Sequence, residues 1–259
     1  GNLNPDFEPK ATDHVNEMIE MIKTLISEGF AYVSSGNVLF SVEKYKKYGC
    51  LSGRSLEDMI TGSRVDVAEY KQKPSDFTLW KPSNKDLPGW KSPWGIGRPG
   101  WHIECSAMSK KYLGEVFDIH AGGLDLIFPH HENEIAQSCC ANNSEFMANY
   151  WLHNGYVTSD GKKMSKSLGN FTTIRDLLNN FDGETIRYAL LQAHYRAPLI
   201  FGKKSLSESK KSLSRLYRSV DGFEVNGEPD TKIVDNLCDD LNTPKALARA
   251  HYLADQANK

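Results

Sequence analysis

A change of pattern at Gly100 sets the strongest limit on the fold. Residues 43 to 100 are interrupted by several glycines and five prolines, namely Pro74, Pro82, Pro88, Pro93 and Pro99. Such a stretch predicts irregular structure, and we expect an insertion here, not part of a core. After Gly100, short apolar segments alternate with helical stretches, which is typical of a parallel α/β sheet. The sequence therefore predicts an α/β fold whose core begins near residue 101.

The periodicity of apolar residues predicts individual elements. Apolar residues recur with helical period from Val15 to Ile26, with Thr12 or Asp13 as the N-cap and Gly29 as the stop. Residues 31–42 alternate around a turn at 34–37, which predicts a hairpin. Downstream we expect strands over 116–120 and 150–153, and helices over 102–113, 129–141, 174–181, 184–193, 206–220 and from 230 to the end.

Composition excludes some classes of protein. The chain has 259 residues, 39% of them hydrophobic, which is enough to bury a core. No stretch approaches the ~20 uninterrupted apolar residues of a membrane span, so we expect no membrane partner. The five cysteines are an odd number without the spacing of a secreted disulfide framework, and reduced thiols of a cytosolic protein fit better. They are Cys50, Cys105, Cys139, Cys140 and Cys238.

Net charge limits how this chain could contact nucleic acid. The value of −2 gives no overall attraction to RNA, so any RNA contact needs a local basic patch. Two candidates are Lys44, Lys46 and Lys47, and the group Lys203, Lys204, Lys210, Lys211, Arg215 and Arg218. A solvated helix face is the more ordinary explanation of each cluster.

Three residues have the spacing of metal ligands. Cys105 and His130 are separated by 24 intervening residues, and Glu134 lies one helical turn beyond His130, on the same face of the expected helix. Zinc binds sulfur, imidazole nitrogen and carboxylate oxygen, usually four in total, so this set implies a fourth ligand or an open position. The alternative is that Cys105 is a buried small hydrophobe and that the two others merely occupy a helix start.

A small, polar and lysine-rich segment lies between the strand expected to end near Thr158 and the helix after Thr173. It runs from Ser159 to Asn170 and contains Lys163 and Lys166. These lysines could place positive charge on a triphosphate as pyrophosphate leaves. The alternative is an exposed basic loop without a function.

Several segments together resemble a known family. The run Lys163-Met164-Ser165-Lys166-Ser167 resembles the KMSKS element of class I aminoacyl-tRNA synthetases. The segments 97–108, 117–120, 122–123 and 128–134, which read GRPGWHIECSAM, FDIH, GG and FPHHENE, resemble the cysteinyl-tRNA synthetase family within that class. The resemblance covers essentially the whole chain.

The resemblance implies a particular architecture. It predicts the second half of a class I synthetase Rossmann-type nucleotide fold with an inserted connective domain, followed by a KMSKS-bearing stem-contact region and the start of an α-helical bundle. The boundaries we expect are 1–100 for the connective insertion, 101–158 for the second half of the Rossmann-type domain, 159–204 for the KMSKS loop and stem-contact helices, and 205–259 for the bundle.

The resemblance also implies site residues. Members of the family hold one zinc ion through two cysteines, a histidine and a glutamate, and the matching positions are Cys105, His130 and Glu134, with the fourth ligand outside this sequence. Trp101 would form the floor of the cysteine pocket, although alone it predicts only a core aromatic. ATP would contact Lys166, then Lys163, as well as Gly122, Gly123 and Asp125 at a strand end, where glycines alone predict only a tight turn.

The activity implied is that of a cysteine-tRNA ligase. Cysteine and ATP, with Mg²⁺, would give cysteinyl-adenylate, and tRNA(Cys) would accept the cysteinyl group; we expect a cytoplasmic monomer. The H-x-G-H element of class I enzymes occurs nowhere in the sequence, so we expect an internal fragment that is inactive alone. Two alternatives stay open, a mycothiol-type ligase that joins cysteine to an amino sugar, and a non-catalytic nucleotide- or zinc-binding paralogue.

Overall fold

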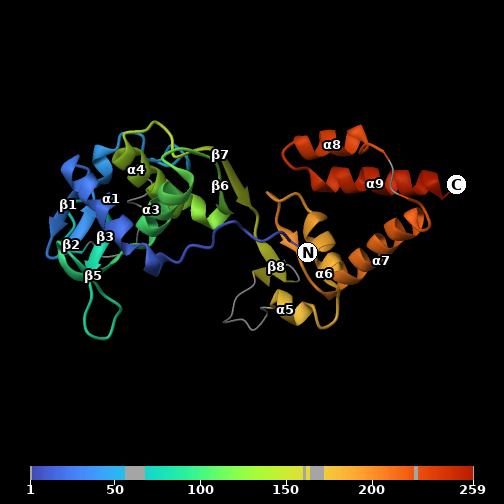
Figure 1. Cartoon of the computed structure of the whole chain (residues 1–259), viewed down its shortest axis with the longest axis horizontal. Helices are drawn as coiled ribbons and strands as arrows, with labels where there is room; N and C mark the ends of the chain where they lie inside the picture. The colour runs from blue at the N-terminus through green and yellow to red at the C-terminus, as the bar shows by residue number, and fades with distance from the viewer. Residues whose placement is uncertain (1, 56–67, 160–161, 164–171, 225–226, 259) are drawn as a thin grey trace. The chain divides into compact units, whose positions relative to one another are not determined.

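The computed structural model describes residues 2–55, 68–159, 162–163, 172–224 and 227–258 (Figure 1). The chain divides into two compact units, residues 4–152 and residues 153–259 together with the first three. None of the helices in these ranges is long and apolar enough to cross a membrane. The two units are coarser than the four expected domains, whose boundaries stay predictions.

The first unit combines helices with a five-stranded sheet and one strand pair. Its helical segments are η1 (Ala11–Asp13), α1 (Val15–Ser27), η2 (Val42–Lys44), α3 (Trp101–Leu113), η3 (Leu124–Leu126), η4 (Ile127–His131) and α4 (Glu132–Asn142). Its strands are β1 (Ala31–Ser34), β2 (Asn37–Phe40), β3 (Phe77–Pro82), β4 (Trp90–Ser92), β5 (Gly95–Pro99), β6 (Phe117–Gly123) and β7 (Ala148–Asn154).

The five-stranded sheet is antiparallel in the order β1-β2-β3-β5-β4. The predicted hairpin is confirmed, because β1 and β2 pair up to Ser34 opposite Asn37. The prediction of irregular, non-core structure over residues 43–100 was wrong for its second half, since β3 lies at the centre of this sheet. Leu79 and Trp80 of β3 are fully buried. Strand β3 ends at Pro82, and its partner β5 contains Gly95, Gly97 and Pro99, so these residues concealed the pairing.

Helix α1 covers the main core of this unit. Its apolar face, with Met18, Ile22 and Leu25 fully buried, packs against α3, α4 and β1 (Figure 1). The helix starts after His14, later than the predicted N-cap, because residues Ala11–Asp13 form a separate 3-10 turn. Strands β6 and β7 form a separate two-stranded sheet. The packed helices α3 and α4 are the elements that carry the expected metal ligands.

The second unit contains a small sheet and a set of helices. Its strands are β8 (Val157–Ser159), β9 (Lys162–Lys163) and β10 (Leu199–Ile200), in the order β10-β8-β9, with β10 parallel and β9 antiparallel to β8. Its helices are α5 (Ile174–Leu177), α6 (Gly183–Leu191), α7 (Lys203–Val220), α8 (Thr231–Cys238) and α9 (Thr243–Ala257).

Two helix predictions in this unit need correction. The single helix expected after residue 230 is a pair, because Asp240 and Leu241 both adopt left-handed φ values of +53° and end α8. The helix expected over 174–181 stops at Leu177. The small core between α6 and α7 is made by Ile186, Ala189 and Leu206.

Candidate metal centre

Helix α3 is positioned by a close contact with strand β3. The N-cap residue Gly100 donates its N–H to the Leu79 carbonyl at 2.8 Å. A Cβ atom at Gly100 would lie 2.0 Å from the Thr78 carbonyl oxygen, so only glycine permits this approach. Trp101 and Cys105 follow in the first two turns of α3 and are therefore fixed relative to the central strand.

Helix α4 and the turn before it carry the other two expected ligands. It begins at Glu132, directly after the irregular helical segment η4, so His130 lies in the turn before α4 and not inside the regular helix that was predicted. The four-residue spacing nevertheless brings the two side chains together, since the His130 Nε2 atom lies 2.7 Å from the Glu134 Oε1 atom. Both side chains are buried.

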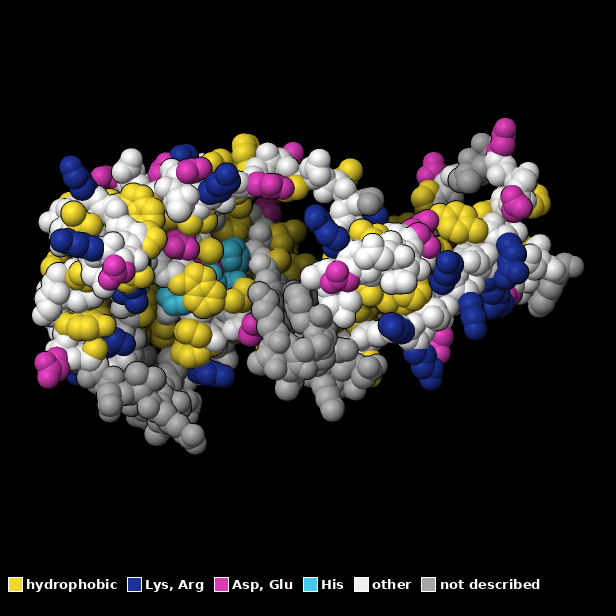
Figure 2. Space-filling view, turned by 90° about the horizontal axis from the view of Figure 1, so that it is seen from below, with side chains coloured by type: hydrophobic (Ala, Val, Ile, Leu, Met, Phe, Trp, Pro, Cys, Tyr) yellow, Lys and Arg dark blue, Asp and Glu magenta, His cyan; other side chains and the backbone are white. Residues whose placement is uncertain are grey.

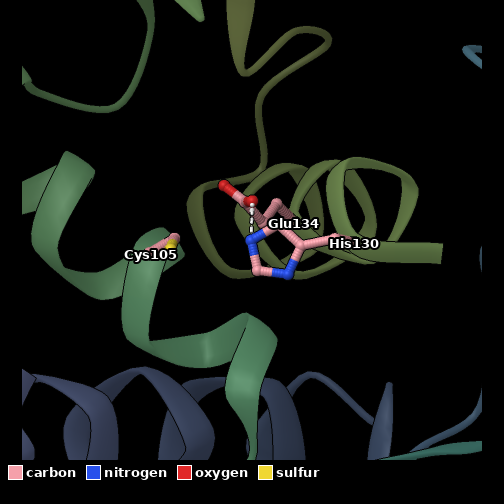
Figure 3. Close-up of side chains that lie close together, drawn as sticks. All are labelled: Cys105, His130 and Glu134. Carbon is pink, nitrogen blue, oxygen red and sulfur yellow. Dashed lines mark ion pairs between the residues drawn. The ribbon is translucent and has the colours of Figure 1, made fainter. Parts of the chain in front are cut away.

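The three expected ligands come together. One donor atom from each of Cys105, His130 and Glu134 lies within 4.8 Å of the donor atoms of the other two. Figure 3 shows Cys105 on one helix facing the His130 and Glu134 pair on the other. The sequence argument relied on helical spacing for two of these residues, and the packing of α3 on α4 adds the thiol.

Glu134 is the centre of the cluster. Its side chain is completely buried, and the His120 Nε2 atom lies 3.2 Å from its Oε2 atom. Burial acts to raise the pKa of Glu134, but the imidazoles of His120 and His130 outweigh burial and lower the pKa to about 2. The distances would permit hydrogen bonds, yet neither carboxylate oxygen receives one with suitable angles. Glu134 is therefore a buried carboxylate held between the imidazoles of His120 and His130.

A second histidine contacts the far side of the His130 ring. The Nδ1 atoms of His102 and His130 lie 2.9 Å apart, and burial followed by the neighbouring His130 lowers the pKa of His102 to about 4. One of these nitrogens must donate and the other accept. A ring nitrogen that binds a metal carries no proton, so a metal-bound His130 would donate through Nδ1 and leave Nε2 for the metal.

The structure also brings together a donor set that was not predicted. His120, His131 and Glu134 likewise offer donor atoms within 4.8 Å of one another, and Glu134 belongs to both sets. His120 comes from β6, which no helical or local spacing connects to α4. Figure 2 shows histidine side chains at the surface of the first unit, bordered by hydrophobic side chains.

The donor chemistry fits zinc. Cys105, His130 and Glu134 supply sulfur, nitrogen and oxygen, all ligands that zinc accepts, and the thiol distinguishes this set from sites for magnesium or calcium. The convergence of these three donor types at one place, with His130 and Glu134 buried, is the observation that favours a cation here. Burial, followed by the charges of Glu134 and Glu104, raises the pKa of Cys105 to about 12, so the thiol needs a cation beside it to deprotonate near neutral pH.

The remaining predicted residues of this unit lie around the cluster. The Trp101 ring centroid is 4.3 Å from that of His130, and the side chain is 58% exposed, which argues against the alternative of a core aromatic. A Cβ atom at Gly122 would lie 2.8 Å from the His131 ring, and one at Gly123 would lie 2.4 Å from the Asp125 carboxylate. Gly122 is thus constrained by the buried His131 ring, whereas at Gly123 the Asp125 side chain could rotate aside.

The predicted lysines belong to the second unit. The main chain of Lys163 lies in β9, opposite Thr158 of β8. Lys166 lies outside the described residues. The structure therefore places only the backbone of one of the two lysines.

Comparisons with known proteins agree with this fold. A cysteine-tRNA ligase of Rhodospirillum rubrum is 57% identical over 263 residues, covering 100% of this chain and 57% of that protein. One of Gluconobacter oxydans is also 57% identical, covering 98% of this chain and 57% of that protein. The chain thus spans little more than half the length of the curated relatives it matches.

A solved structure shows similarity at the level of the fold alone. Mycobacterium tuberculosis methionyl-tRNA synthetase in complex with methionyl-adenylate has a TM-score of 0.62 and 14% sequence identity, over 97% of this chain and 65% of that one. The family described as tRNA synthetases class I (C) catalytic domain matches residues 1–211. With an α/β fold shared with a class I enzyme and this match over most of its length, the chain belongs to the class I (C) tRNA synthetase family.

Proposed function

We propose that the full-length protein is a cysteine-tRNA ligase. The observation that carries this proposal is the convergence of a thiol, an imidazole and a carboxylate from Cys105, His130 and Glu134 at one place. It is supported by relatives of 57% identity that are cysteine-tRNA ligases. A metal site of this donor chemistry suits a substrate that is recognised through sulfur.

Cys105, His130 and Glu134 would hold one zinc ion, with a fourth protein ligand from outside this sequence. Zinc, when bound, would supply a Lewis acid that keeps a substrate thiol deprotonated near neutral pH. Serine offers a harder and much less acidic hydroxyl, so it competes poorly for such a site. Trp101, whose exposed ring lies against His130, would form the floor of the amino acid pocket.

The other predicted residues would serve ATP. Lys166 and, second, Lys163 would stabilise charge on the triphosphate, and Mg²⁺ would accompany the nucleotide. Gly122, Gly123 and Asp125 would lie at the adenosine end of the site. Attack of the cysteine carboxylate on the α-phosphate gives an adenylate and pyrophosphate, and a terminal ribose hydroxyl of tRNA(Cys) then takes the cysteinyl group. These steps depend on positioning and charge stabilisation, without a covalent protein nucleophile. We further propose a cytoplasmic monomer.

Amino-acid-dependent exchange of labelled pyrophosphate into ATP tests the first step. The full-length protein should support exchange with cysteine and not with serine, and removal of zinc by a chelator should abolish it until zinc is returned. Exchange that proceeds equally with serine would refute recognition through sulfur.

Transfer to an acceptor tests the second step. The proposal requires cysteine to become attached to tRNA. Attachment to an amino sugar in place of tRNA would identify a mycothiol-type ligase, and absence of exchange with every amino acid would identify a non-catalytic paralogue.

A further inference from the structure

Glu132 is a buried acid that the predicted chemistry does not use. It is the first residue of α4, lies between His131 and Asn133, and is completely buried. An unpaired carboxylate in such a place would be strongly destabilising, so its partners must be identified.

Main-chain N–H groups of a short segment surround this carboxylate. Gly49 donates to Oε1 at 2.9 Å and Ser52 donates to Oε2 at 2.8 Å, while the N–H of Leu51 lies 3.5 Å from Oε1. Hydrogen bonds to an ionised acceptor are about twice as strong as neutral ones. Residues 49–52 therefore form a receptor for one side chain of α4.

Contacts of neighbouring residues also hold this segment against α4 and the turn before it. The Tyr48 hydroxyl donates to the Asn133 side-chain oxygen, and the Arg54 guanidinium lies 4.8 Å from the centroid of the Phe128 ring. The segment 48–54 thus contacts the chain just before, at and just after Glu132.

The position of Glu132 on the helix gives these contacts a consequence. His130 and Glu134 are four residues apart and share one face, whereas a residue midway between them projects from roughly the opposite face. When Glu132 is held on the opposite face, the helical turn that carries His130 and Glu134 cannot rotate about the helix axis. Such a rotation would move the His130 ring and the Glu134 carboxylate away from Cys105.

We propose that Glu132 is a positioning residue of the metal centre and that residues 49–52 are its receptor. The inference rests on the proposed zinc site, because it concerns how the His130 and Glu134 ligands are held. It assigns to the connective segment a role in metal binding, although that segment contributes none of the predicted ligands.

The test measures the affinity of the full-length protein for Zn²⁺ by competition with a chromophoric chelator. Glu132→Gln keeps the size of the side chain but removes the charge that the N–H groups bind, and we expect zinc affinity to fall about 10-fold, as for other residues that orient metal ligands. Tyr48→Phe removes only the hydrogen bond to the Asn133 side chain, and we expect a smaller loss of zinc affinity.

Asp76→Asn is the matched control. Asp76 is also a buried carboxylate in the first unit and accepts main-chain N–H groups from Val42 at 3.2 Å and Lys73 at 3.1 Å. It does not contact α4 through these bonds, so this variant should lose stability while zinc affinity stays nearly unchanged. The absorption spectrum of the Co²⁺-substituted protein gives a second readout, and only Glu132→Gln and Tyr48→Phe should change it.

The outcomes separate this inference from the proposed function. Failure of the unmodified protein to bind Zn²⁺ would reject the metal site itself. If that protein binds zinc, equal affinity in Glu132→Gln, or an equal loss in Asp76→Asn, would overturn the role of Glu132. Should Glu132→Gln not fold, unchanged zinc affinity and an unchanged Co²⁺ spectrum in Tyr48→Phe would overturn it as well.

Discussion

Helices α4 and α7 place their charged residues in opposite environments. Every residue of α4 from Glu132 to Cys140 is buried, including two glutamates. In α7 only Leu206 and Ser209 are buried, and its lysines and arginines face solvent. Figure 2 shows Lys and Arg side chains on the part of the molecule that the C-terminal helices form.

This contrast shows that a buried charge constrains its surroundings far more than an exposed one. A buried carboxylate must be satisfied, so each glutamate of α4 specifies its own neighbours, imidazoles for Glu134 and main-chain N–H groups for Glu132. An exposed pair such as Arg215 with Asp255 contributes little and specifies little. We therefore expect substitutions of polar residues to have large effects around α4 and small effects along α7.

The largest effect is expected for zinc binding. Cys105→Ala should lower zinc affinity by about 60-fold to 700-fold, because four ligands share an apparent binding free energy of ~10–16 kcal/mol and each tenfold change is ~1.4 kcal/mol. His120→Asn should lower it less, about 10-fold, because His120 acts through its contact with Glu134. Metal analysis after equilibrium dialysis measures both.

Arg215→Ala in α7 is the control for this comparison and should leave zinc binding unchanged. Equal zinc content in Cys105→Ala and the unmodified protein would show that our ligand assignment is wrong. A larger loss in His120→Asn than in Cys105→Ala would favour the His120, His131 and Glu134 set instead.

The sequence predicted those parts of the site that depend on local spacing. His130 and Glu134 could be paired from their four-residue separation, and the helices over 102–113 and 129–141 were close to the observed α3 and α4. Contacts between distant segments could not be found in this way. His120 reaches Glu134 from β6, and the N–H groups around Glu132 come from residues 49–52, which lie some 80 residues earlier.

The fold shows the same limit. Residues 43–100 suggested an insertion because prolines and glycines interrupt them, yet Leu79 and Trp80 are in the main core. Gly97 illustrates the reason, since a Cβ atom there would lie 2.3 Å from the Trp80 indole nitrogen. A glycine that permits close packing of two strands cannot be distinguished in the sequence from a glycine that breaks one.

The next largest effect should come from the apolar side of α7. Leu206 is fully buried against Ile186 and Ala189, so Leu206→Ala should lower the free energy of unfolding by about 2–4 kcal/mol. Leu216 in the same helix is only partly buried, and Leu216→Ala should cost less than about 1.5 kcal/mol. Urea unfolding followed by circular dichroism measures both. Equal losses would mean that burial does not decide stability in this helix.

The smallest effect concerns an exposed charge of the second unit and its dependence on pH. Arg196 donates two hydrogen bonds to Asp240, at 2.7 and 3.1 Å, and the Tyr195 hydroxyl donates a third at 2.6 Å. Arg196 first, and then Tyr195, lower the pKa of Asp240 to about 2. Because the folded pKa lies below the ordinary value of ~3.9, the charge stabilises the folded state above about pH 4 and loses this effect as pH falls toward 2.

Asp240→Asn isolates that charge, because asparagine tolerates the left-handed backbone at this position as well as aspartate does. The unmodified protein should be the more stable of the two near pH 6, and the difference in the free energy of unfolding should shrink between pH 4 and pH 2. Asp239→Asn is the matched control, since Asp239 pairs only with Lys245 among the described residues, and its effect near pH 6 should be smaller. A difference for Asp240→Asn that stays constant from pH 6 to pH 2 would show that the Arg196 and Tyr195 contacts act through their shape and not through the charge.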